Sequence, residues 1–564
     1  MRYRQLLFFL ALAMCTSFAN GQNQNPLFIP DTLSGTVFDL NMAPSTMQFR
    51  AGTPTETYGI NQDYLGPTMI FNSGDFITLN VTNNLPDTST MHWHGMHVSA
   101  MDDGGPHTKI FPGDTWSPDF TVLDEATTFW YHPHLHHKTA FQVYHGAAGM
   151  IIVRDENEAS LSLPRTYGVD DFPLIIQDKS FDENNQLVFE NLSDSVMVNG
   201  TFNPYLEVPA QMVRFRMLNA ANQRVFNFVP PPGLPAFQIA SDGGLLEQPI
   251  PITRMRLAPG ERAEVVIDFS GSSNLNFLGT CNNSELGNGI SGGPGSPGGP
   301  PTPLDGNDFS LIQFRVRPPT ANPVTMLSPN LNTIEAPDPA DADRVRTKYF
   351  DTDANGFFAI NSMLFSMDHM NDTILLGDTE IWEIVNVTDI AHPFHIHDVQ
   401  FHIIYLNGLP IPPHLRGRKD VILVTPGDSI RFIAIFEDFA DDVVPYMYHC
   451  HNLFHEDAGM MAQFLVVENP LSIENDLLED ANPRFGVYPN PTNDKLIVHP
   501  KEGIIDQDLT IEVLNVWGQR LQAIDVRLGV SEVDIQLDAY PTGIYLLNIT
   551  DEDGRKEVIR VMKQ

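Results

Sequence analysis

The chain has 564 residues, of which 32 are basic and 70 acidic, so its formal net charge is −38 at pH 7. This balance argues against nucleic acid and anionic membrane as partners, because binding phosphate requires clustered lysine and arginine. A hydrophobic fraction of 42% excludes wholesale disorder, and three cysteines are too few for a disulfide framework. Abundant proline and glycine favour short strands joined by turns, and the length predicts about three to four domains.

The N-terminus has the pattern of a secretory signal peptide. Two arginines precede the apolar run at residues 6–14, and small residues follow it at Ser17, Ala19 and Gly21. The run is too short to span a membrane, so we expect residues 1–21 to be cleaved and the mature chain to be exported and soluble. An uncleaved signal anchor is the alternative.

A glycine followed by an acidic residue opens an alternating apolar run at five places along the chain. A period of two puts alternate side chains on one buried face, so these runs predict β-strands. Their recurrence predicts a duplicated β-sandwich unit, although ordinary turns before ordinary strands would explain any single case. The five entries are Gly74-Asp75, Gly113-Asp114, Gly260-Glu261, Gly377-Asp378 and Gly427-Asp428.

Two changes in composition divide the chain. Residues 287–303 are rich in glycine and proline, which predicts a flexible surface loop within a middle domain. Residues 475–483 are acidic and contain proline, which predicts a linker. We therefore expect an all-β protein with domains over residues 22–165, 166–320 and 321–470, a linker over 471–484 and a small β-sandwich over 485–564.

The 19 histidines include five pairs of the form His-x-His, far more than composition alone predicts. Residues i and i+2 of a strand share one face, so each pair presents two imidazoles to one metal centre. A single histidine is more often packed or hydrogen-bonded in a core, but a repeated pattern makes that explanation weak. The pairs are His92/His94, His132/His134, His134/His136, His395/His397 and His449/His451.

Residues 448–461 (YHCHNLFHEDAGMM) carry the most specific signal in the chain. Cys450 lies between His449 and His451, so on an extended backbone its thiolate faces away from both imidazoles. One strand is therefore expected to contact two metal sites, with only a few bonds between the sulfur and either ring.

The same segment supplies the remaining ligands of one site. His455 and Met460 follow Cys450 at +5 and +10, and His392 completes a set of two imidazoles, one thiolate and a weak axial thioether. That set is typical of a blue-copper electron-transfer site, whereas structural zinc prefers a closed tetrahedron of Cys and His.

Eight further histidines remain, in the four pairs His92/His94, His132/His134, His395/His397 and His449/His451. All-imidazole ligation suits copper, and eight ligands suffice for three ions with positions left open for a small molecule. A one-electron site beside a multi-ion cluster stores four electrons. Dioxygen, which is reduced to water, is the expected four-electron acceptor.

The four motifs resemble those of three-domain multicopper oxidases, a family that includes laccases, bilirubin oxidases and bacterial cuprous oxidases. Two motifs lie in the first domain and two in the third, in the order of the family, and the resemblance covers roughly residues 22–470. It implies three cupredoxin-like Greek-key β-sandwich domains, of which the middle one binds no copper. The motifs are residues 92–95 (HWHG), 130–134 (WYHPH), 392–397 (HPFHIH) and 449–460 (HCHNLFHEDAGM).

The resemblance also implies ligands for four copper ions. The type 1 copper is expected to be bound by His392, Cys450, His455 and Met460. The type 2 copper is expected to be bound by His92 and His395. The type 3 pair is expected to be bound by His94, His132, His134, His397, His449 and His451, with the trinuclear cluster between the first and third domains.

Two carboxylates and the cysteine complete the expected mechanism. Reduction of dioxygen to water consumes four protons, so acids must stand near the cluster. Asp103 matches an acid that the family places near the type 2 copper, and Glu456 matches one beside the type 3 pair. Electrons are expected to enter at Cys450. A turn aspartate and a loop glutamate are the alternatives.

The electron donor is expected to be a small molecule that binds near His392 and His455. Residues 362–370 (SMLFSMDHM) are compatible with a cuprous-ion site, because thioethers select Cu(I), and equally with a core strand. Ile390 replaces a methionine that cuprous oxidases tend to carry. We therefore expect a laccase-like oxidase of phenols, aromatic amines or bilirubin-like pigments; a cuprous oxidase that detoxifies copper and a non-catalytic copper-sequestering protein are the alternatives.

The tail from about residue 485 differs from the rest of the chain. It contains residues 487–492 (VYPNPT), alternating strands and the basic segment 555–563 (RKEVIRVMK). It resembles the C-terminal sorting domain of type IX secretion cargo from Bacteroidetes over essentially its whole length. The resemblance implies that the type IX machinery exports the protein across the outer membrane, to be released or anchored at the cell surface. An accessory β-sandwich is the alternative.

Overall fold

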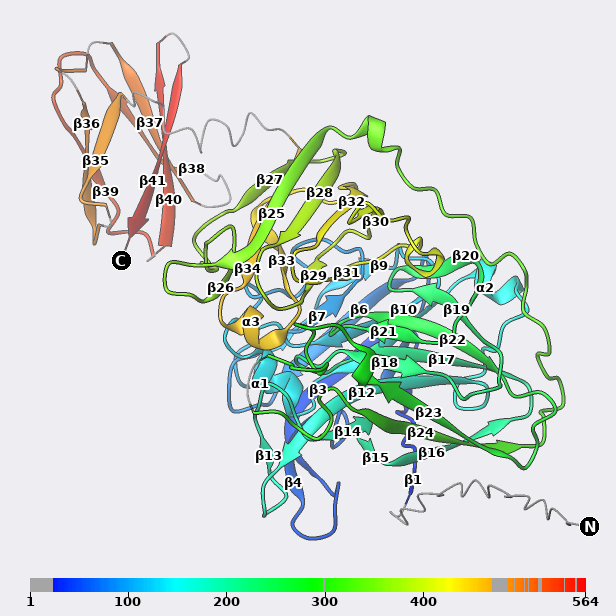
Figure 1. Cartoon of the computed structure of the whole chain (residues 1–564). Helices are drawn as coiled ribbons and strands as arrows, with labels where there is room; N and C mark the ends of the chain where they lie inside the picture. Colours follow the sequence, from blue (N-terminus) through cyan, green and yellow to red (C-terminus); the bar gives the residue numbers. More distant parts are fainter. Residues whose placement is uncertain are drawn as a thin grey trace, which may run out of the picture.

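The computed structural model describes residues 24–468, except 298–299, and residues 484–563, except 491, 502, 506, 516–519, 542 and 553–554. Almost all regular structure in these ranges is β (Figure 1), which confirms the predicted all-β class. The predicted signal peptide and nearly all of the predicted linker lie outside the described residues. Within the described ranges, no helix has the length and apolar character needed to cross a membrane.

The first unit consists of two sheets whose facing side chains form one buried apolar cluster, which includes Leu40, Leu79, Phe129 and Ile151. One sheet has the order β2 (Thr32–Ser34), β5 (Thr68–Asn72), β11 (Gly149–Arg154), β10 (Thr127–His132) and β7 (His92–His94). The other has β4 (Thr55–Ile60), β3 (Val37–Met47), β6 (Phe76–Asn83) and β8 (Thr115–Trp116), with β9 (Asp119–Thr121) also paired to β6. Two short helices flank β11 in the chain: α1 (Thr139–Tyr144) precedes this strand and α2 (Glu156–Ser160) follows it.

The second unit has two larger sheets around its own apolar cluster, which includes Ile176, Phe215, Val265 and Phe314. The first runs β15 (Thr201–Phe202), β14 (Ser195–Val198), β12 (Asp171–Phe181), β17 (Met212–Asn219), β22 (Arg262–Asp268), β19 (Ala236–Ser241) and β20 (Gly244–Pro251), with β13 (Leu187–Val188) beside β12. The second runs β1 (Asn25–Pro26), β16 (Pro204–Pro209), β24 (Asp308–Arg317), β23 (Asn276–Asn282), β18 (Phe226–Val229) and β21 (Met255–Leu257). The first residues of the described chain thus pair with the second unit. A 3₁₀ turn, η1 (Asn283–Glu285), follows β23.

The third unit repeats the two-sheet arrangement around Trp382, Phe394, Phe432 and Tyr448. One sheet runs β26 (Phe358–Ile360), β25 (Arg344–Thr352), β28 (Thr379–Asn386), β32 (Ser429–Ile435) and β30 (His402–Leu406). The other runs β27 (Asp372–Leu375), β34 (Met461–Val467), β33 (Asp441–Cys450), β29 (His392–Ile396) and β31 (Val421–Val424). Helix α3 (Leu453–Asp457) and the 3₁₀ turns η2 (Pro339–Asp341) and η3 (Pro413–Leu415) complete it.

The tail forms a separate pair of sheets with its own apolar cluster, which includes Leu496, Ile511, Ile535 and Leu547. One sheet runs β35 (Phe485–Tyr488), β36 (Lys495–Pro500) and β39 (Val533–Gln536). The other runs β38 (Arg520–Val526), β37 (Leu509–Asn515), β40 (Gly543–Asp551) and β41 (Lys556–Lys563). The tail therefore has a core that does not depend on the other units.

The five predicted strand entries share one backbone conformation. Each glycine has a positive φ, between 77° and 90°, and each precedes a strand: Gly74 before β6, Gly113 before β8, Gly260 before β22, Gly377 before β28 and Gly427 before β32. Glycine adopts this left-handed region without the steric cost that other residues carry. The repeated sequence signal is thus a repeated turn at the start of a strand.

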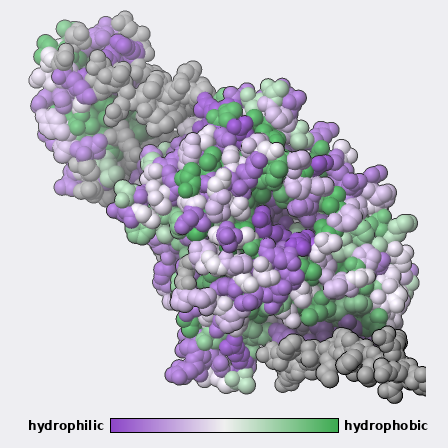
Figure 2. All heavy atoms as spheres, viewed as in Figure 1, coloured by the Kyte–Doolittle hydropathy of each residue, from purple (hydrophilic) through white to green (hydrophobic). Residues whose placement is uncertain are grey.

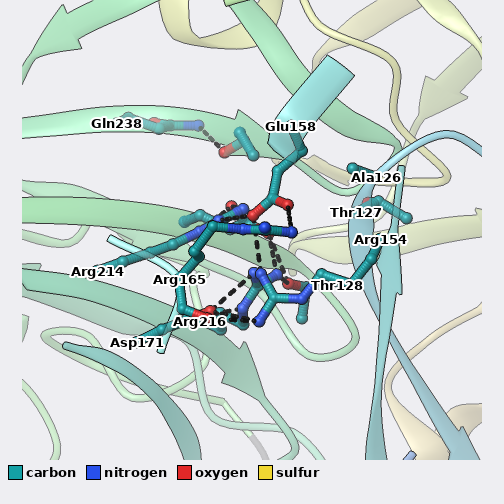
Figure 3. Close-up of polar contacts among 12 residues, drawn as sticks. Ala126, Thr127, Thr128, Arg154, Glu158, Arg165, Asp171, Arg214, Arg216 and Gln238 are labelled. Atoms are coloured by element: carbon teal, nitrogen blue, oxygen red, sulfur yellow. Dashed lines mark hydrogen bonds and ion pairs between the residues drawn. The ribbon is translucent and has the colours of Figure 1, made fainter. Parts of the chain in front are cut away.

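A buried ion-pair network joins the first and second units (Figure 3). Glu158 of α2 accepts from Arg214 of β17 at 2.7 Å, and Arg154 of β11 donates to Asp171 of β12 at 2.9 Å. Arg216 forms a fork on the same aspartate, at 2.8 and 3.1 Å. Because buried charges are costly unless they are paired, these contacts fix how the two units dock.

The glycine- and proline-rich segment packs between the second and third units. Ile290 is 4% exposed and lies in a small apolar cluster with Leu423. The carbonyl of Gly289 accepts from the amide of Ala391 at 2.8 Å, directly before the β29 histidines. Residues 290–293 are therefore buried, unlike the predicted flexible surface loop, whereas Gly287, Asn288 and Gly295 are exposed.

The outer surface of the molecule is mixed in character. Figure 2 shows polar residues over much of the visible face, with apolar patches between them. Eight of the nine histidines in the pairs singled out in the sequence lie beneath this surface and are at most 1% exposed, whereas His136 is partly exposed.

Candidate metal centres

Strand pairing brings the histidine pairs together two by two. In the first unit β7 and β10 are antiparallel, with His92 opposite His132 and Trp130 opposite His94. In the third unit β29 and β33 are antiparallel, with His395 opposite His449 and Phe394 opposite Cys450. Each sheet therefore presents two motifs side by side, as the period of two predicts.

The rings from the first and third units meet in three buried groups, each with its ligand nitrogens within 4.8 Å of one another. Nδ1 of His94 lies 3.4 Å from Nε2 of His132 and 3.2 Å from Nε2 of His451. Nε2 of His134 lies 3.1 Å from Nε2 of His449. The groups are His94/His132/His451, His134/His397/His449 and His92/His94/His395.

Several of these nitrogens lack any hydrogen-bond partner in the described structure. They include Nε2 of His92, His395 and His397, although all three rings are buried. The opposite nitrogen is occupied: Nδ1 of His92 donates to the carbonyl of Asp103 at 3.0 Å, and Nδ1 of His395 to that of Asp420 at 2.9 Å. A buried unpaired acceptor is costly and calls for a partner, and clustered neutral imidazoles suit copper.

A second kind of centre lies on the other side of β33. Sγ of Cys450 lies 3.5 Å from Nδ1 of His392 and 3.6 Å from Nδ1 of His455. The two imidazole nitrogens are 3.2 Å apart. Burial lowers the pKa of His455 to about 3, so its imidazole is neutral and its lone pair is free to bind a metal. These three residues form one candidate ligand group.

The loop after α3 brings the backbone of Met460 next to Cys450 and His455. The amide of Met460 donates to the carbonyl of His455 at 2.8 Å, and the amide of Cys450 donates to the carbonyl of Met460 at 3.0 Å. Met460 is fully buried in the apolar cluster that contains Cys450. The backbone thus brings all four expected type 1 residues into one place.

The comparisons with known proteins agree with this geometry. Two family models described as multicopper oxidase match residues 41–158 and residues 334–470. A multicopper oxidase of Staphylococcus haemolyticus is 32% identical over 440 residues, which cover 76% of this chain and 88% of the relative. The chain belongs to the multicopper oxidase family.

Other relatives extend this result. The solved structure of a laccase-like multicopper oxidase from Ochrobactrum, described as active on lignin model compounds and lignosulfonate, superposes with a TM-score of 0.71 at 33% identity, covering 78% of this chain and all of the other. A cell division protein of Xenorhabdus nematophila, FtsP, is 31% identical over 82% of this chain and 98% of its own length. A model described as a secretion system C-terminal sorting domain matches residues 486–564, which confirms the predicted sorting domain.

Within this multicopper oxidase, the two predicted acids lie directly behind candidate ligand rings. Asp103 contacts Nδ1 of His397 at 2.8 Å and Nδ1 of His92 at 3.2 Å. Burial opposes ionisation of Asp103, but the imidazoles of His397 and His92 hold its pKa below the usual range. Glu456 lies 3.2 Å from Nδ1 of His449 and 3.5 Å from Nδ1 of His134, and burial raises its pKa. The pKa of Asp103 is thus lowered, which favours its ionised form, whereas the pKa of Glu456 is raised, which favours its protonated form.

Sequence reasoning missed two residues that touch candidate ligands. The hydroxyl of Thr388 contacts Nε2 of His392 at 2.9 Å, and Asp420 contacts Nε2 of His94 at 3.1 Å. Asp420 stands directly before β31, the strand that pairs with β29. Neither residue belongs to a histidine motif, so the sequence carries no local signal for its role.

Proposed function

We propose that the protein is a laccase-like oxidase that couples oxidation of small aromatic donors to reduction of dioxygen to water. The observation that carries the proposal is the convergence of eight buried imidazoles, several with unpaired nitrogens, on one face of β33 while Cys450 joins two imidazoles on the other. When bound, copper would supply one-electron transfer at the cysteine group and four-electron reduction of dioxygen at the imidazole groups.

We assign each residue to a copper ion according to the imidazole or cysteine group to which it belongs. We assign the type 1 copper to His392, Cys450, His455 and Met460. We assign the type 2 copper to His92 and His395, whose free Nε2 atoms share a group with His94. We assign the type 3 pair to His94, His132 and His451 on one ion and to His134, His397 and His449 on the other, which makes four ions per chain.

The two acids have different proposed roles in proton transfer. Glu456 is buried and its pKa is raised, so it holds a proton beside the His134 and His449 rings and is suited to release it as negative charge develops there. Asp103 is held ionised between His92 and His397 and keeps the proton on Nδ1 of each ring. We propose that Glu456 is a proton donor and that Asp103 accepts and relays protons at the type 2 side.

The donor would bind where His455 reaches the surface. His455 is partly exposed, and the centroids of its ring and the ring of Phe358 are 4.7 Å apart. The neighbouring Phe454 packs against Phe189, which is 40% exposed, with the centroids 4.8 Å apart. Aromatic rings at this entrance favour a planar aromatic donor, because offset and edge contacts between rings are stabilising. The lignin-related activity named for the Ochrobactrum structure supports the same donor class.

Two observations keep alternatives open. Residues 362–370 lie against the loop that carries Met460, since the amide of Phe365 donates to the carbonyl of Gly459 at 2.9 Å, and Met363 is 43% exposed. Thioethers there favour cuprous ion as the donor. The second alternative is a copper-sequestering protein without oxidase activity; the relative named as a cell division protein is compatible with it, because that name includes no oxidase activity.

The sorting domain supports secretion, and we propose that the chain enters this route through an N-terminal signal peptide. Type IX machinery would then be its export partner, with the mature oxidase released or anchored at the outer surface. The small-molecule donor and dioxygen would be its other partners.

Oxygen consumption by the copper-loaded mature chain tests the proposal. A phenolic donor and Cu(I) are compared at matched concentrations. Faster uptake with the phenol is the expected result. Faster uptake with Cu(I) would identify a cuprous oxidase, and no uptake despite four bound copper ions would identify a copper-storing protein.

A further inference from the structure

Asp420 contacts two rings of the candidate trinuclear site at once. Its Oδ1 accepts from Nε2 of His94 at 3.1 Å, and its main-chain carbonyl accepts from Nδ1 of His395 at 2.9 Å. The two rings stack with centroids 3.7 Å apart and an interplanar angle of 5°. Asp420 is completely buried, so this contact is protected from competing water.

The contact decides which nitrogen of His94 is free. A neutral imidazole carries one proton on either nitrogen, and a carboxylate or carbonyl oxygen holds the proton on the nitrogen that faces it. Asp420 therefore keeps the proton of His94 on Nε2 and leaves the lone pair on Nδ1, the atom that faces His132 and His451. The rings of His132, His134, His449 and His451 make their close contacts through Nε2 instead.

Asp420 is in turn held by Arg262 of the second unit. Nη1 donates to Oδ1 and Nη2 to Oδ2, both at 2.6 Å. The other three N–H groups donate to the carbonyls of Thr128 at 3.1 Å, Gly260 at 3.1 Å and Asp242 at 3.0 Å. All five guanidinium donors are thus paired, and a lysine with its three donors on one atom cannot reproduce this fork.

The site leaves little room for another arrangement. A Cβ on Gly95 would lie 2.6 Å from both Nη2 of Arg262 and Oδ2 of Asp420. A Cβ on Gly260 would lie 2.9 Å from Cγ of His451. Both glycines have positive φ, at 93° and 83°. The backbone at Gly95 therefore lies directly against the Arg262–Asp420 pair, and the backbone at Gly260 lies directly against the ring of His451.

We propose that Arg262 and Asp420 are positioning residues of the trinuclear copper site, through which the second unit, although it supplies no ligand imidazole, sets the tautomer and orientation of His94 and His395. The inference rests on the proposed copper site. It assigns the second unit a role beyond that of a spacer. Because Arg262, which does not release its protons, binds both carboxylate oxygens of Asp420, the role of Asp420 is to hold geometry and not to pass protons.

The test uses Arg262→Lys and Asp420→Asn in the full-length, copper-loaded chain. Copper per chain, the electron paramagnetic resonance signal of type 2 copper, the near-ultraviolet absorption of the type 3 pair and the visible thiolate-to-copper band are measured on the folded fraction. We expect both variants to keep the visible band, to lose trinuclear copper and its signals, and to reduce oxygen about 10- to 100-fold more slowly.

Arg216→Lys is the matched control. It removes another buried Arg–Asp fork of the same unit, on Asp171, with no contact to a ligand ring (Figure 3). We expect it to lower stability and to leave the type 2 and type 3 signals unchanged. Wild-type trinuclear signals in both Arg262→Lys and Asp420→Asn would overturn the proposal. So would failure of both to fold while Arg216→Lys folds, since the pair would then have a purely structural role.

The wild-type chain separates this inference from the proposed function. If wild type binds four copper ions and consumes oxygen while the variants are unaffected, only the positioning role is wrong. If wild type shows no trinuclear signals, the proposed copper site is itself wrong and the positioning role falls with it.

Discussion

The carboxyl group of Glu456 lies 3.2 Å from Nδ1 of His449 and is only 1% exposed. Burial raises its pKa, which favours the protonated carboxyl at a place where water does not compete. We expect Glu456→Gln to slow oxygen reduction about 100-fold, the range in which a positioned acid acts, while the visible band and copper content stay unchanged. Stopped-flow reoxidation of the reduced protein measures this directly.

Asp457→Asn is the control for Glu456→Gln. Asp457 accepts from the amides of Thr139 and Ala140 at 3.0 and 2.9 Å and so caps α1 instead of facing a ligand ring. We expect lower thermal stability with normal reoxidation. Normal reoxidation of Glu456→Gln would remove Glu456 from the proposed proton supply.

Replacement of Cys450 tests the type 1 assignment. We expect Cys450→Ser to abolish the visible band, because the thiolate supplies it, and to leave trinuclear copper largely bound on the other side of β33. Cys281→Ser is the matched control, since Cys281 is equally buried but lies in the apolar cluster of the second unit. A visible band that survives Cys450→Ser would refute the assignment.

Removal of His94 and His134 together tests the imidazole groups. Each ring belongs to a different proposed type 3 set, so His94→Ala with His134→Ala should stop oxygen reduction while the type 1 copper still accepts an electron from the donor. Anaerobic bleaching of the visible band, followed by exposure to oxygen, separates the two steps. His145→Ala is the control, because this ring contacts only the carbonyl of Phe141 among the described hydrogen-bond partners. Undiminished turnover of the double variant would contradict the cluster.

The network of Figure 3 predicts how stability depends on pH. Burial alone would raise the pKa of Glu158, but Arg214 and then Arg154 lower it to about 2, from 4.5 for a free side chain. A lowered carboxylate pKa stabilises the folded state above about pH 4.5, and the contribution is lost as the pH falls towards about 2. We expect Glu158→Gln to cost about 3–5 kcal/mol at neutral pH, because it removes a carboxylate from a buried charge network and leaves Arg214 with Glu264, and Arg154 with Asp171, as the remaining acidic partner.

Chemical unfolding of the copper-free chain at neutral pH and at about pH 3 measures this effect. The difference between wild type and Glu158→Gln should shrink at the lower pH. Glu156→Gln, on the exposed side of the same helix, should behave as wild type at both. A difference that stays constant with pH would mean that Glu158 is not ionised in the fold.

The sequence was sufficient for the fold class and for the histidines and the cysteine that converge in the structure, because both depend on local periodicity. His-x-His on a strand and the spacing from Cys450 to Met460 need only a few consecutive residues. Asp420 is separated by 326 residues from His94 and by 158 from Arg262, so no local pattern marks it. Ile290 packs against Leu423, which is likewise distant in the sequence. The glycine- and proline-rich composition around Ile290 therefore could not indicate that this side chain is buried.

Each imidazole group combines rings from residues 92–134 with rings from residues 395–451. A nascent chain that ends before residue 395 therefore offers no complete ligand group, however well its first unit has folded. On the proposed copper assignment, a chain without residues 395–451 would hold no trinuclear copper, and by mass action the bound ions would favour the arrangement in which the first and third units are docked over the one in which they are apart.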